Sequence, residues 1–539
     1  MVFAGLATLR HIARTDWIGV FYYNADSLVL PLVERSIHHG EAFQWVFSSQ
    51  NFFFPEGAFF FLSTLFTDNP RVALSINAVL NLVALYALLR VIAHVLSRHS
   101  RHRLLEICIA LGAALLFVVF VLLEPIASPN GSGIATPFLF TTYYYGVVLG
   151  GLGMLALVLW VTNAFSGHSI ERRKKIIFLG AAALLTALVT FSNPLYIFQV
   201  IAPLWVTLLI LIFMTRVGWR FFLQTIAATG GAVIVAFGIR ALMPQLFAAG
   251  VSRYVAISNI PMSIENIYLT FKELLSTPQG ALKLLIIGLI LLVNFALLIF
   301  ALYGQARPKL RTRISTAEVF IVTFVSVSTV SLAVGQVLTG SLTNRYLEPT
   351  FIFPLVTVLA IGVYTLRRML LEVRRVELRR SLSRFAVGIA GGVSVVIVLA
   401  GSLSIPIVAD ANRSDNYTAS SCLEKFVGTS GVNGVGTFWT TRPFELYGNL
   451  SGRFLQVKPD MTIFEWMNNR AAYANKDFSY VVYDGSGVFT RDDITRTLGQ
   501  PKNVVTCDGY EIYNYAGMAG EKTLTDTIDR SLQASLGQH

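Results

Sequence analysis

Ten apolar runs, each close to the length of a membrane-spanning helix, fill most of the chain up to residue 406. A helix needs roughly 20 apolar residues to cross the hydrocarbon core of a bilayer. The chain of 539 residues is 54% hydrophobic and only 13% charged, about half the charged share of a typical soluble domain. The pattern predicts a mostly α, polytopic transmembrane helical bundle of about 10–11 spans. The runs lie near residues 71–97, 104–124, 143–165, 176–192, 195–214, 221–242, 281–303, 316–338, 351–367 and 385–406.

The connectors between these runs alternate between basic and non-basic. Arg172 to Lys175 and Arg307 to Arg313 are typical of the basic set, whereas loops 243–280 and 339–350 are poor in basic residues. Cytoplasmic loops carry an excess of Lys and Arg. We therefore expect the basic connectors to be cytoplasmic and the other set to face outward. The same distribution accounts for the net charge of +12 without a nucleic-acid partner.

The orientation makes the protein a multi-pass protein of the plasma membrane with two outward-facing parts. These are a first external loop over residues 15–70 and everything after residue 407, so we expect a transmembrane domain at 1–407 and an extracytoplasmic domain at 408–539. Residues 1–14 are short for a span and carry Arg10 and Arg14. Because loop 15–70 is nevertheless expected outside, either the N-terminus is extracytoplasmic or a further transmembrane helix lies upstream of Met1, and we favour the second.

Residues 408–539 differ in composition from the rest of the chain. Strand-like and helix-like segments alternate there, which is typical of a small α/β domain. We expect strands at 435–439, 480–483 and 503–507, helices near 463–475 and 490–499, and a frayed end over the last 20 residues. In an oxidising compartment, Cys422 and Cys507 would form a disulfide, whereas Cys108 lies in an apolar run and is a small core residue.

Asp26 is the first candidate functional residue. Residues 25–37 are predicted to form an amphipathic helix on the membrane surface, with Asp26 near its first turn. An acid there is either a helix-start residue favoured by the dipole, or a base for an acceptor hydroxyl, or a ligand for a divalent cation such as Mg²⁺ or Mn²⁺. Glu34 lies on roughly the same helical face, where it either shares the site or pairs with Arg35.

Glu56 is the second candidate carboxylate. It follows Phe52-Phe-Phe-Pro and precedes an apolar segment, so it also fits the first turn of a helix that starts at the proline. An acid so close to hydrocarbon is costly unless it serves a purpose. Glu56 is therefore a candidate catalytic residue and, together with Asp26, a candidate metal ligand.

Between these two acids lie candidate substrate contacts. His38 and His39 have the chemistry for acid–base work or metal binding, but adjacent histidines point apart on a helix. Trp45 belongs to a group of aromatic residues that suits a membrane-interface belt and a sugar-stacking surface equally well.

Arg345 is the only basic residue in connector 339–350. A guanidinium at the outer edge of a membrane cavity can hold a phosphate through two parallel hydrogen bonds. Tyr346 follows it, and Lys272 in loop 243–280 is a weaker candidate for the same phosphate. The alternative is a snorkelling arginine that pairs with Glu348.

These segments resemble the GT-C superfamily of polytopic membrane glycosyltransferases. Asp26-Ser-Leu, Gly40, Trp45 and Phe53-Phe-Pro-Glu56 resemble a bacterial subgroup that carries an acid in a long first external loop and a second acid after a Phe-Pro pair. In that subgroup the second acid is usually Asp, and here it is Glu56. Arg345-Tyr-Leu-Glu-Pro resembles an Arg-Tyr-x-x-Pro element found before a late helix of these enzymes.

The resemblance implies an inverting hexosyl- or pentosyltransferase at the external membrane face. Its donor would be a sugar on a polyprenyl-phosphate carrier, and its acceptor a glycan, lipid or protein of the cell envelope. Two other classes stay open: a transporter or flippase of lipid-linked sugars, and a membrane-anchored envelope assembly or sensor protein. The predicted spans hold few ionisable groups and no internal repeat, which favours the enzyme over the transporter.

Overall fold

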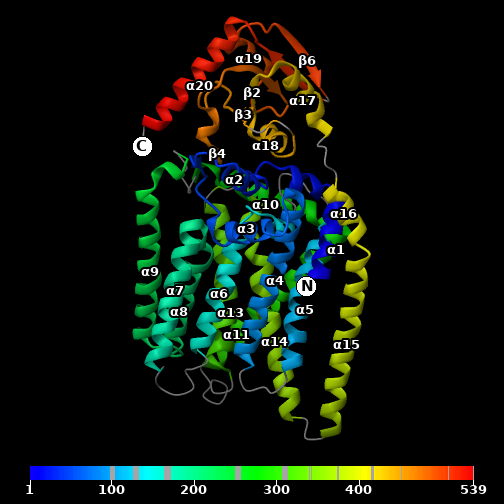
Figure 1. Cartoon of the computed structure of the whole chain (residues 1–539). Coiled ribbons are helices and arrows are strands. Elements are labelled where there is room, and N and C mark those ends of the chain that lie inside the picture. The colour runs from blue at the N-terminus through cyan, green and yellow to red at the C-terminus, as the bar shows by residue number, and fades with distance from the viewer. Residues whose placement is uncertain are drawn as a thin grey trace.

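The computed structural model of the chain is a bundle of long helices with a small α/β domain at one end, which we call the domain end of the bundle (Figure 1). The predicted basic connector from Arg307 to Arg313 lies outside the described residues. The structure describes residues 1–97, 103–124, 133–162, 171–248, 257–305, 314–338, 340, 343–372, 376–413, 418–448, 450, 452–507 and 509–537.

Nine helices in the described ranges are long and apolar enough to cross a membrane. The predicted run at 195–214 forms a shorter apolar helix, Ile197–Phe213. It consists of a π-helical segment, η5 (Ile197–Ile201), that continues into α8 (Ala202–Phe213). The helices that contain the nine spans are α4 (Pro70–Leu96), α5 (Arg103–Leu122), α6 (Tyr145–Thr162), α7 (Arg172–Ser192), α9 (Trp219–Leu242), α11 (Pro278–Gln305), α13 (Thr316–Leu338), α14 (Pro349–Glu372), and α15 (Val376–Ser402) with α16 (Ile405–Arg413).

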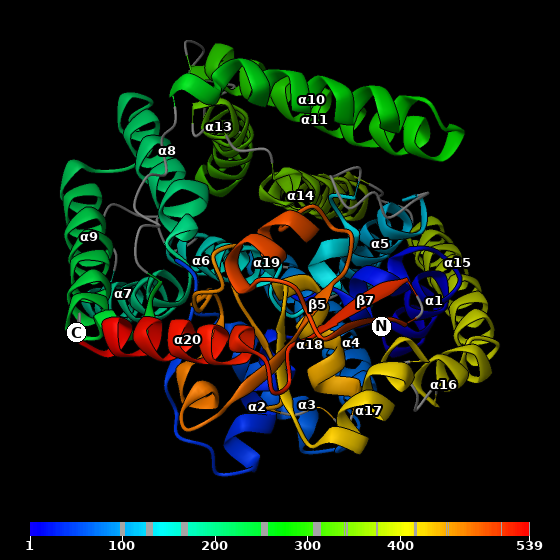
Figure 2. The same ribbon diagram turned by 90° about the horizontal axis from the view of Figure 1, so that it is seen from above.

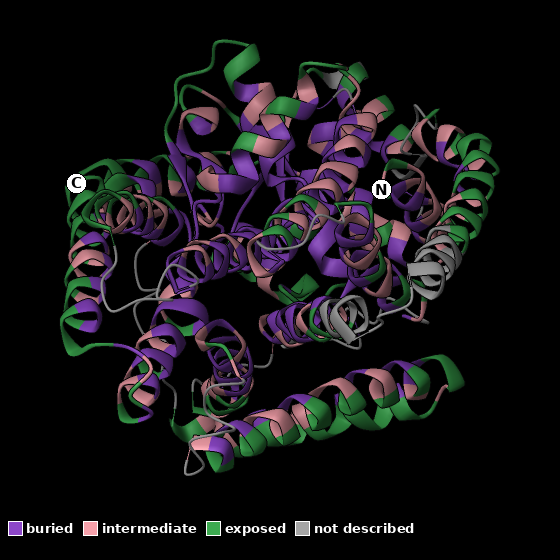
Figure 3. Cartoon of the chain, turned by 90° about the horizontal axis from the view of Figure 1, so that it is seen from below, coloured by how far each residue is buried: buried purple, intermediate pink, exposed green. Residues whose placement is uncertain are grey.

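Burial divides these helices into a central and a peripheral set. In the 18-residue apolar stretch of α6, 83% is buried inside the protein, whereas only 17% of the corresponding stretch of α11 is buried. Figure 3 shows exposed residues along the outward faces of the peripheral helices and buried residues at the centre. Apolar side chains on the outer faces, such as Leu285 and Leu292 of α11, suit a lipid environment.

The segment between α1 (Val2–Ala13) and α4 lies at the domain end of the bundle (Figure 1). Helix α2 (Val29–His38) overlaps the predicted amphipathic helix at 25–37 but starts four residues later and ends one residue later. The expectation that its apolar residues lie on the membrane surface is wrong, because Val29 to Val33 are buried and α18 (Phe438–Tyr447) of the C-terminal domain packs against α2. The elements are η1 (Gly19–Tyr23), α2 (Val29–His38), β1 (Trp45–Val46), η2 (Phe53–Gly57) and α3 (Ala58–Thr64).

The other short elements connect the long helices. Viewed from above, α10 and α11 lie at one edge of the bundle, whereas the C-terminal domain covers its centre (Figure 2). The connecting elements are η3 (Thr136–Leu139), η6 (Pro244–Leu246), η7 (Ile257–Asn259), α10 (Ile260–Leu275) and η8 (Asn344–Leu347).

The C-terminal domain is built on a five-stranded mixed sheet in the order β3-β2-β5-β7-β6. β2 runs parallel to β3 and β5, and β7 runs antiparallel to β5 and β6. The strands are β2 (Asn433–Gly436), β3 (Phe454–Gln456), β5 (Phe478–Tyr483), β6 (Asn503–Cys507) and β7 (Tyr510–Asn514).

The strands predicted at 480–483 and 503–507 are confirmed as β5 and β6. The one predicted at 435–439 ends early, because Thr437 caps a helix, α18 (Phe438–Tyr447), by accepting a hydrogen bond from the Thr440 amide. The helix predicted at 490–499 is confirmed as α19 (Arg491–Leu498), which begins at a capping box formed by Thr490 and Asp493.

Two predictions for this domain are wrong. In place of a helix at 463–475 there is a strand, β4 (Asn468–Asn469), followed by a 3₁₀ turn, η9 (Arg470–Tyr473), because β4 pairs with β1 of the first loop. Those of the last 20 residues that the structure describes are not frayed but belong to α20 (Ala519–Gly537). Leu524, Ile528 and Leu532 recur every four residues, and this apolar stripe packs onto the domain core.

The predicted disulfide is confirmed. Cys422 on α17 (Thr418–Ser430) is bonded to Cys507 at the end of β6, with 5.6 Å between their Cα atoms. Cys108 is a free, partly buried cysteine in α5.

Candidate functional site

A cavity of about 390 Å³ lies between the helical bundle and the C-terminal domain. Asp26 and Arg345 line the bundle wall of this cavity, together with Gln50, Phe52, Thr142 and Tyr144. The opposite wall belongs to the C-terminal domain and is mostly aromatic or apolar. It includes Phe438, Trp439, Phe464, Trp466, Val488 and one cation, Lys458.

Asp26 and Arg345 form an ion pair in this wall, although 319 positions separate them in the chain. Nη1 of Arg345 donates to Oδ2 of Asp26 at 3.1 Å. The Asp26 side chain is 12% exposed and that of Arg345 25%, so the pair is accessible from the cavity but largely shielded. The alternative pairing of Arg345 with Glu348 is wrong, because both carboxyl oxygens of Glu348 are buried without a hydrogen-bond partner among the described residues.

Two tyrosines hold the guanidinium of Arg345. Its central carbon lies 4.6 Å from the ring centre of Tyr143 and 5.3 Å from that of Tyr144. Burial raises the pKa of both phenols, so they stay neutral and act as cation–π partners. The ring of Tyr346 packs on that of Tyr144, with 5.2 Å between their centres. The two rings hold the guanidinium at the cavity wall, where a planar guanidinium can bind an anion through two hydrogen bonds.

The turn that carries Asp26 is fixed by the segment just before α6. The hydroxyl of Thr142 donates to the Asp26 carbonyl at 2.6 Å, and that of Thr141 to the Ser27 carbonyl at 2.8 Å. The hydroxyl of Tyr143 donates to Oδ1 of Asn24, which also accepts the Asp26 amide. Asp26 therefore sits on a supported turn that ends where α2 begins.

Glu56 is enclosed in the protein and does not line the cavity. Its Oε1 accepts the Gly146 amide at 3.2 Å, and a Cβ at residue 146 would come within 2.4 Å of the carboxyl, so only glycine allows this approach. Burial raises the pKa of Glu56 to about 8, against smaller opposing effects of backbone hydrogen bonds. The carboxyl is therefore mostly protonated at neutral pH, and Glu56 does not contact the space where a substrate would bind.

The remaining predicted site residues, all in the described part of the chain, also lie outside the cavity lining. His38 is exposed at the end of α2, Glu34 is half-buried on the same helix, and Lys272 is exposed on α10. Trp45 is buried in β1, where its ring lies 5.7 Å from the guanidinium carbon of Arg442. Tyr346 contributes through its contact with Tyr144 rather than through the lining.

The structure does not bring Asp26 and Glu56 together as the pair of cation ligands that the acidic loop suggested. Asp26 is the only acidic residue among those that line the cavity, and Arg345 already occupies one of its oxygens. Glu56 is enclosed elsewhere. Within the described residues, no group of three or more His, Cys, Asp or Glu side chains could hold a metal ion.

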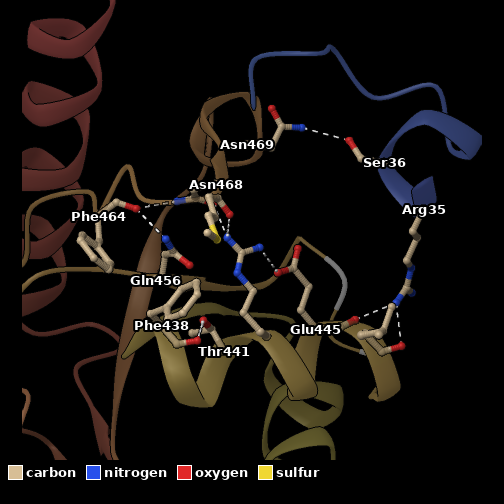
Figure 4. A network of polar contacts seen from close by, with 12 residues as sticks. Arg35, Ser36, Phe438, Thr441, Glu445, Gln456, Phe464, Asn468 and Asn469 are labelled. Atoms are coloured by element: carbon tan, nitrogen blue, oxygen red, sulfur yellow. Dashed lines mark hydrogen bonds and ion pairs between the residues drawn. The ribbon is translucent and has the colours of Figure 1, made fainter. Parts of the chain in front are cut away.

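The C-terminal domain is fastened to the first loop by backbone and side-chain contacts (Figure 4). Strands β1 and β4 pair antiparallel, and the side-chain amide of Asn469 donates to Ser36 Oγ at 3.1 Å. Nη1 of Arg35 donates to the carbonyls of Glu445 and Leu446 at 2.7 and 3.0 Å, in the last turn of α18. A cation is favourable there, because the last carbonyls of a helix lack partners within the helix. These contacts hold the domain wall of the cavity opposite Asp26.

The sequence analysis missed both supports of the ion pair and the whole domain wall. The Thr141-Thr142-Tyr143-Tyr144 run before an apolar segment was an available signal, because hydroxyl-bearing residues gather there beside a span. Trp439 and Trp466 gave little signal, since aromatic residues are scattered throughout the chain.

No family model, curated protein or solved structure matches this chain. The fold and site by themselves define the class: a helical bundle compatible with a multi-pass membrane protein, capped by an α/β domain, with one charged and one aromatic wall around a shared cavity.

Proposed function

We propose that the protein is an inverting glycosyltransferase that moves a sugar from a polyprenyl-phosphate carrier to a cell-envelope acceptor at the external membrane face. One observation carries the proposal: Asp26 and Arg345, the candidate base and the candidate phosphate ligand, line one cavity and touch each other. Cavities between a bundle and a second domain are frequent ligand sites. The GT-C-like motifs of the sequence contain both residues.

In the proposed reaction, the guanidinium of Arg345 binds the donor phosphate. Because the same guanidinium bonds Asp26 in the structure, the phosphate would compete for it and free the carboxylate. The oxygen of the acceptor hydroxyl then attacks the anomeric carbon while Asp26 accepts its proton. The bond between the anomeric carbon and the phosphate oxygen breaks, and the polyprenyl phosphate leaves with the electron pair.

The leaving phosphate needs no general acid, because it departs as an anion that the neighbouring cation stabilises. The aromatic supports of Arg345 keep the cation in place during this step. Glu56 would stabilise the site through the hydrogen bond that it accepts from the Gly146 amide at the start of α6, rather than act on substrate. The C-terminal domain would shield the cleft or bind the acceptor.

Replacing the ion pair tests the proposal. Asp26→Asn removes the base and should lower transfer from a polyprenyl-phosphate sugar, measured in isolated membranes, by about 10²–10⁴-fold. It also removes a competitor for Arg345, so binding of polyprenyl phosphate to the purified protein should tighten. Arg345→Lys should weaken that binding, because an ammonium cannot reproduce a planar two-point grip.

Asp68→Asn and Arg453→Lys are matched controls, since both residues are exposed and lie outside the cavity lining. Transfer by Asp26→Asn at the parental rate would refute the role of the base. Specific binding of polyprenyl-phosphate sugar by the parent without any transfer would favour a transporter. Unchanged polyprenyl-phosphate binding in Arg345→Lys would refute the phosphate site.

A further inference from the structure

The domain wall of the cavity is formed at one particular edge of the five-stranded sheet. β3, β2 and β5 run parallel, so their carboxyl ends meet at the same edge. Val457 and Lys458 follow β3, Phe438 and Trp439 follow β2, and Val488 lies in the loop after β5. Loops at the carboxyl ends of parallel strands are the usual place for ligands in α/β folds. All three loops line the cavity. The domain wall of the cavity therefore lies at the sheet edge where ligands usually bind.

The chemistry of this wall differs from that of the bundle wall. Trp439 is 46% exposed, although a large aromatic surface is costly to leave in water. Trp466 and Phe464 are partly exposed beside it, and the ring of Phe438 lies 5.0 Å from that of Trp439 and 6.2 Å from that of Phe464. The wall therefore presents a supported aromatic surface, with the cation Lys458 among the described residues that line it.

An aromatic surface of this kind suits a carbohydrate. The C–H faces of a sugar ring pack on indole rings, and the hydroxyls at the ring edge stay free for hydrogen bonds. An anionic phosphate instead fits the opposite wall, where Arg345 supplies the charge. The bundle wall therefore suits the phosphate of the donor, and the domain wall suits a carbohydrate acceptor.

We infer that Trp439 and Trp466 form the acceptor subsite, and that the acceptor is a carbohydrate whose terminal sugar stacks on them with one hydroxyl toward Asp26. This inference rests on the proposed function and names its acceptor class. The same assignment makes the C-terminal domain half of the active site, held in position by the contacts of Arg35 and Asn469.

The test uses the full-length protein in isolated membranes that contain its own acceptor, supplied with a radiolabelled polyprenyl-phosphate sugar. Trp439→Ala and Trp466→Ala should each lower transfer to the polysaccharide fraction by roughly tenfold, the upper end of what one aromatic contact contributes. Trp439→Phe should retain most of the transfer. Binding of sugar-free polyprenyl phosphate to the purified variants should equal that of the parent.

Met518→Ala is the matched control, since Met518 is also a large exposed residue of this domain but lies outside the cavity lining. Recovery of the Cys422–Cys507 disulfide in each variant checks that the domain has folded. Parental transfer in both Ala variants, or label that enters lipid or protein instead of polysaccharide, would overturn the acceptor subsite. Weaker polyprenyl-phosphate binding would also overturn it, because the wall would then belong to the donor. A parent that transfers no sugar would refute the proposed function itself.

Discussion

Glu56→Gln separates a buried structural acid from an acid that acts on substrate. Burial raises the pKa of Glu56 from 4.5 to about 8. The folded protein therefore holds this proton over a pH range in which the unfolded chain has released it. Because Glu56 binds its proton more tightly in the folded state, its contribution to the free energy of unfolding falls as the pH rises from about 4.5 to about 8 and is level outside that range.

The size of the effect follows from the width of that window. Each pH unit inside it costs the parent about 1.4 kcal/mol. Glutamine does not titrate, so between pH 5.5 and 7.5 its stability relative to the parent should rise by on the order of 3 kcal/mol. With an unfolding entropy of about 2.1 cal/mol/K per residue, this corresponds to a change in Tm of about 3 °C for a chain of this length.

The assay is a thermal unfolding series across this pH range on the purified protein in detergent. Glu265→Gln serves as control, because this carboxyl is exposed on α10 and its replacement should leave the pH dependence of Tm unchanged. Transfer by Glu56→Gln should stay near that of the parent, since Glu56 lies outside the cavity lining. If the Tm difference between Glu56→Gln and the parent does not vary with pH, the raised pKa of the buried Glu56 carboxyl is refuted. Loss of transfer in a more stable variant would show that Glu56 acts on substrate.

Two further predictions concern the architecture. Alkaline phosphatase, which is active only outside the cytoplasm, should be active when fused after residue 410 and inactive when fused near residue 378; the reverse would overturn the orientation and the external position of the cavity. Replacing both Cys422 and Cys507 with Ser should destabilise the C-terminal domain by roughly 2–4 kcal/mol, because the bond closes a long loop between positions 85 residues apart. Limited proteolysis of the full chain should then cut that domain faster, and equal cleavage rates would contradict this.

The path of the chain was predictable from the sequence wherever local pattern determines structure. The long apolar runs allow only helices in a bilayer, because every backbone amide must be bonded within its own segment. The aromatic and β-branched run at 480–483 is typical of a strand in the same way, and it forms part of β5. Asp26 and Arg345 were recognisable as candidates because each is an isolated charge next to apolar runs.

Only the tertiary structure decided what those charges face. Sequence spacing says nothing about the approach of Arg345 to Asp26 across 319 positions, nor about the enclosure of Glu56 against Gly146. In place of the helix expected at 463–475 the structure has β4, whose backbone hydrogen-bonding groups pair with those of β1. No local sequence pattern indicates this pairing. The helix that carries Leu524, Ile528 and Leu532 is likewise ordered because these three residues pack into the domain core. The sequence by itself determined the long apolar helices and the two charged residues. Long-range packing decided that a charged wall and an aromatic wall enclose one cavity, because burial and pairing depend on partners far away in the chain.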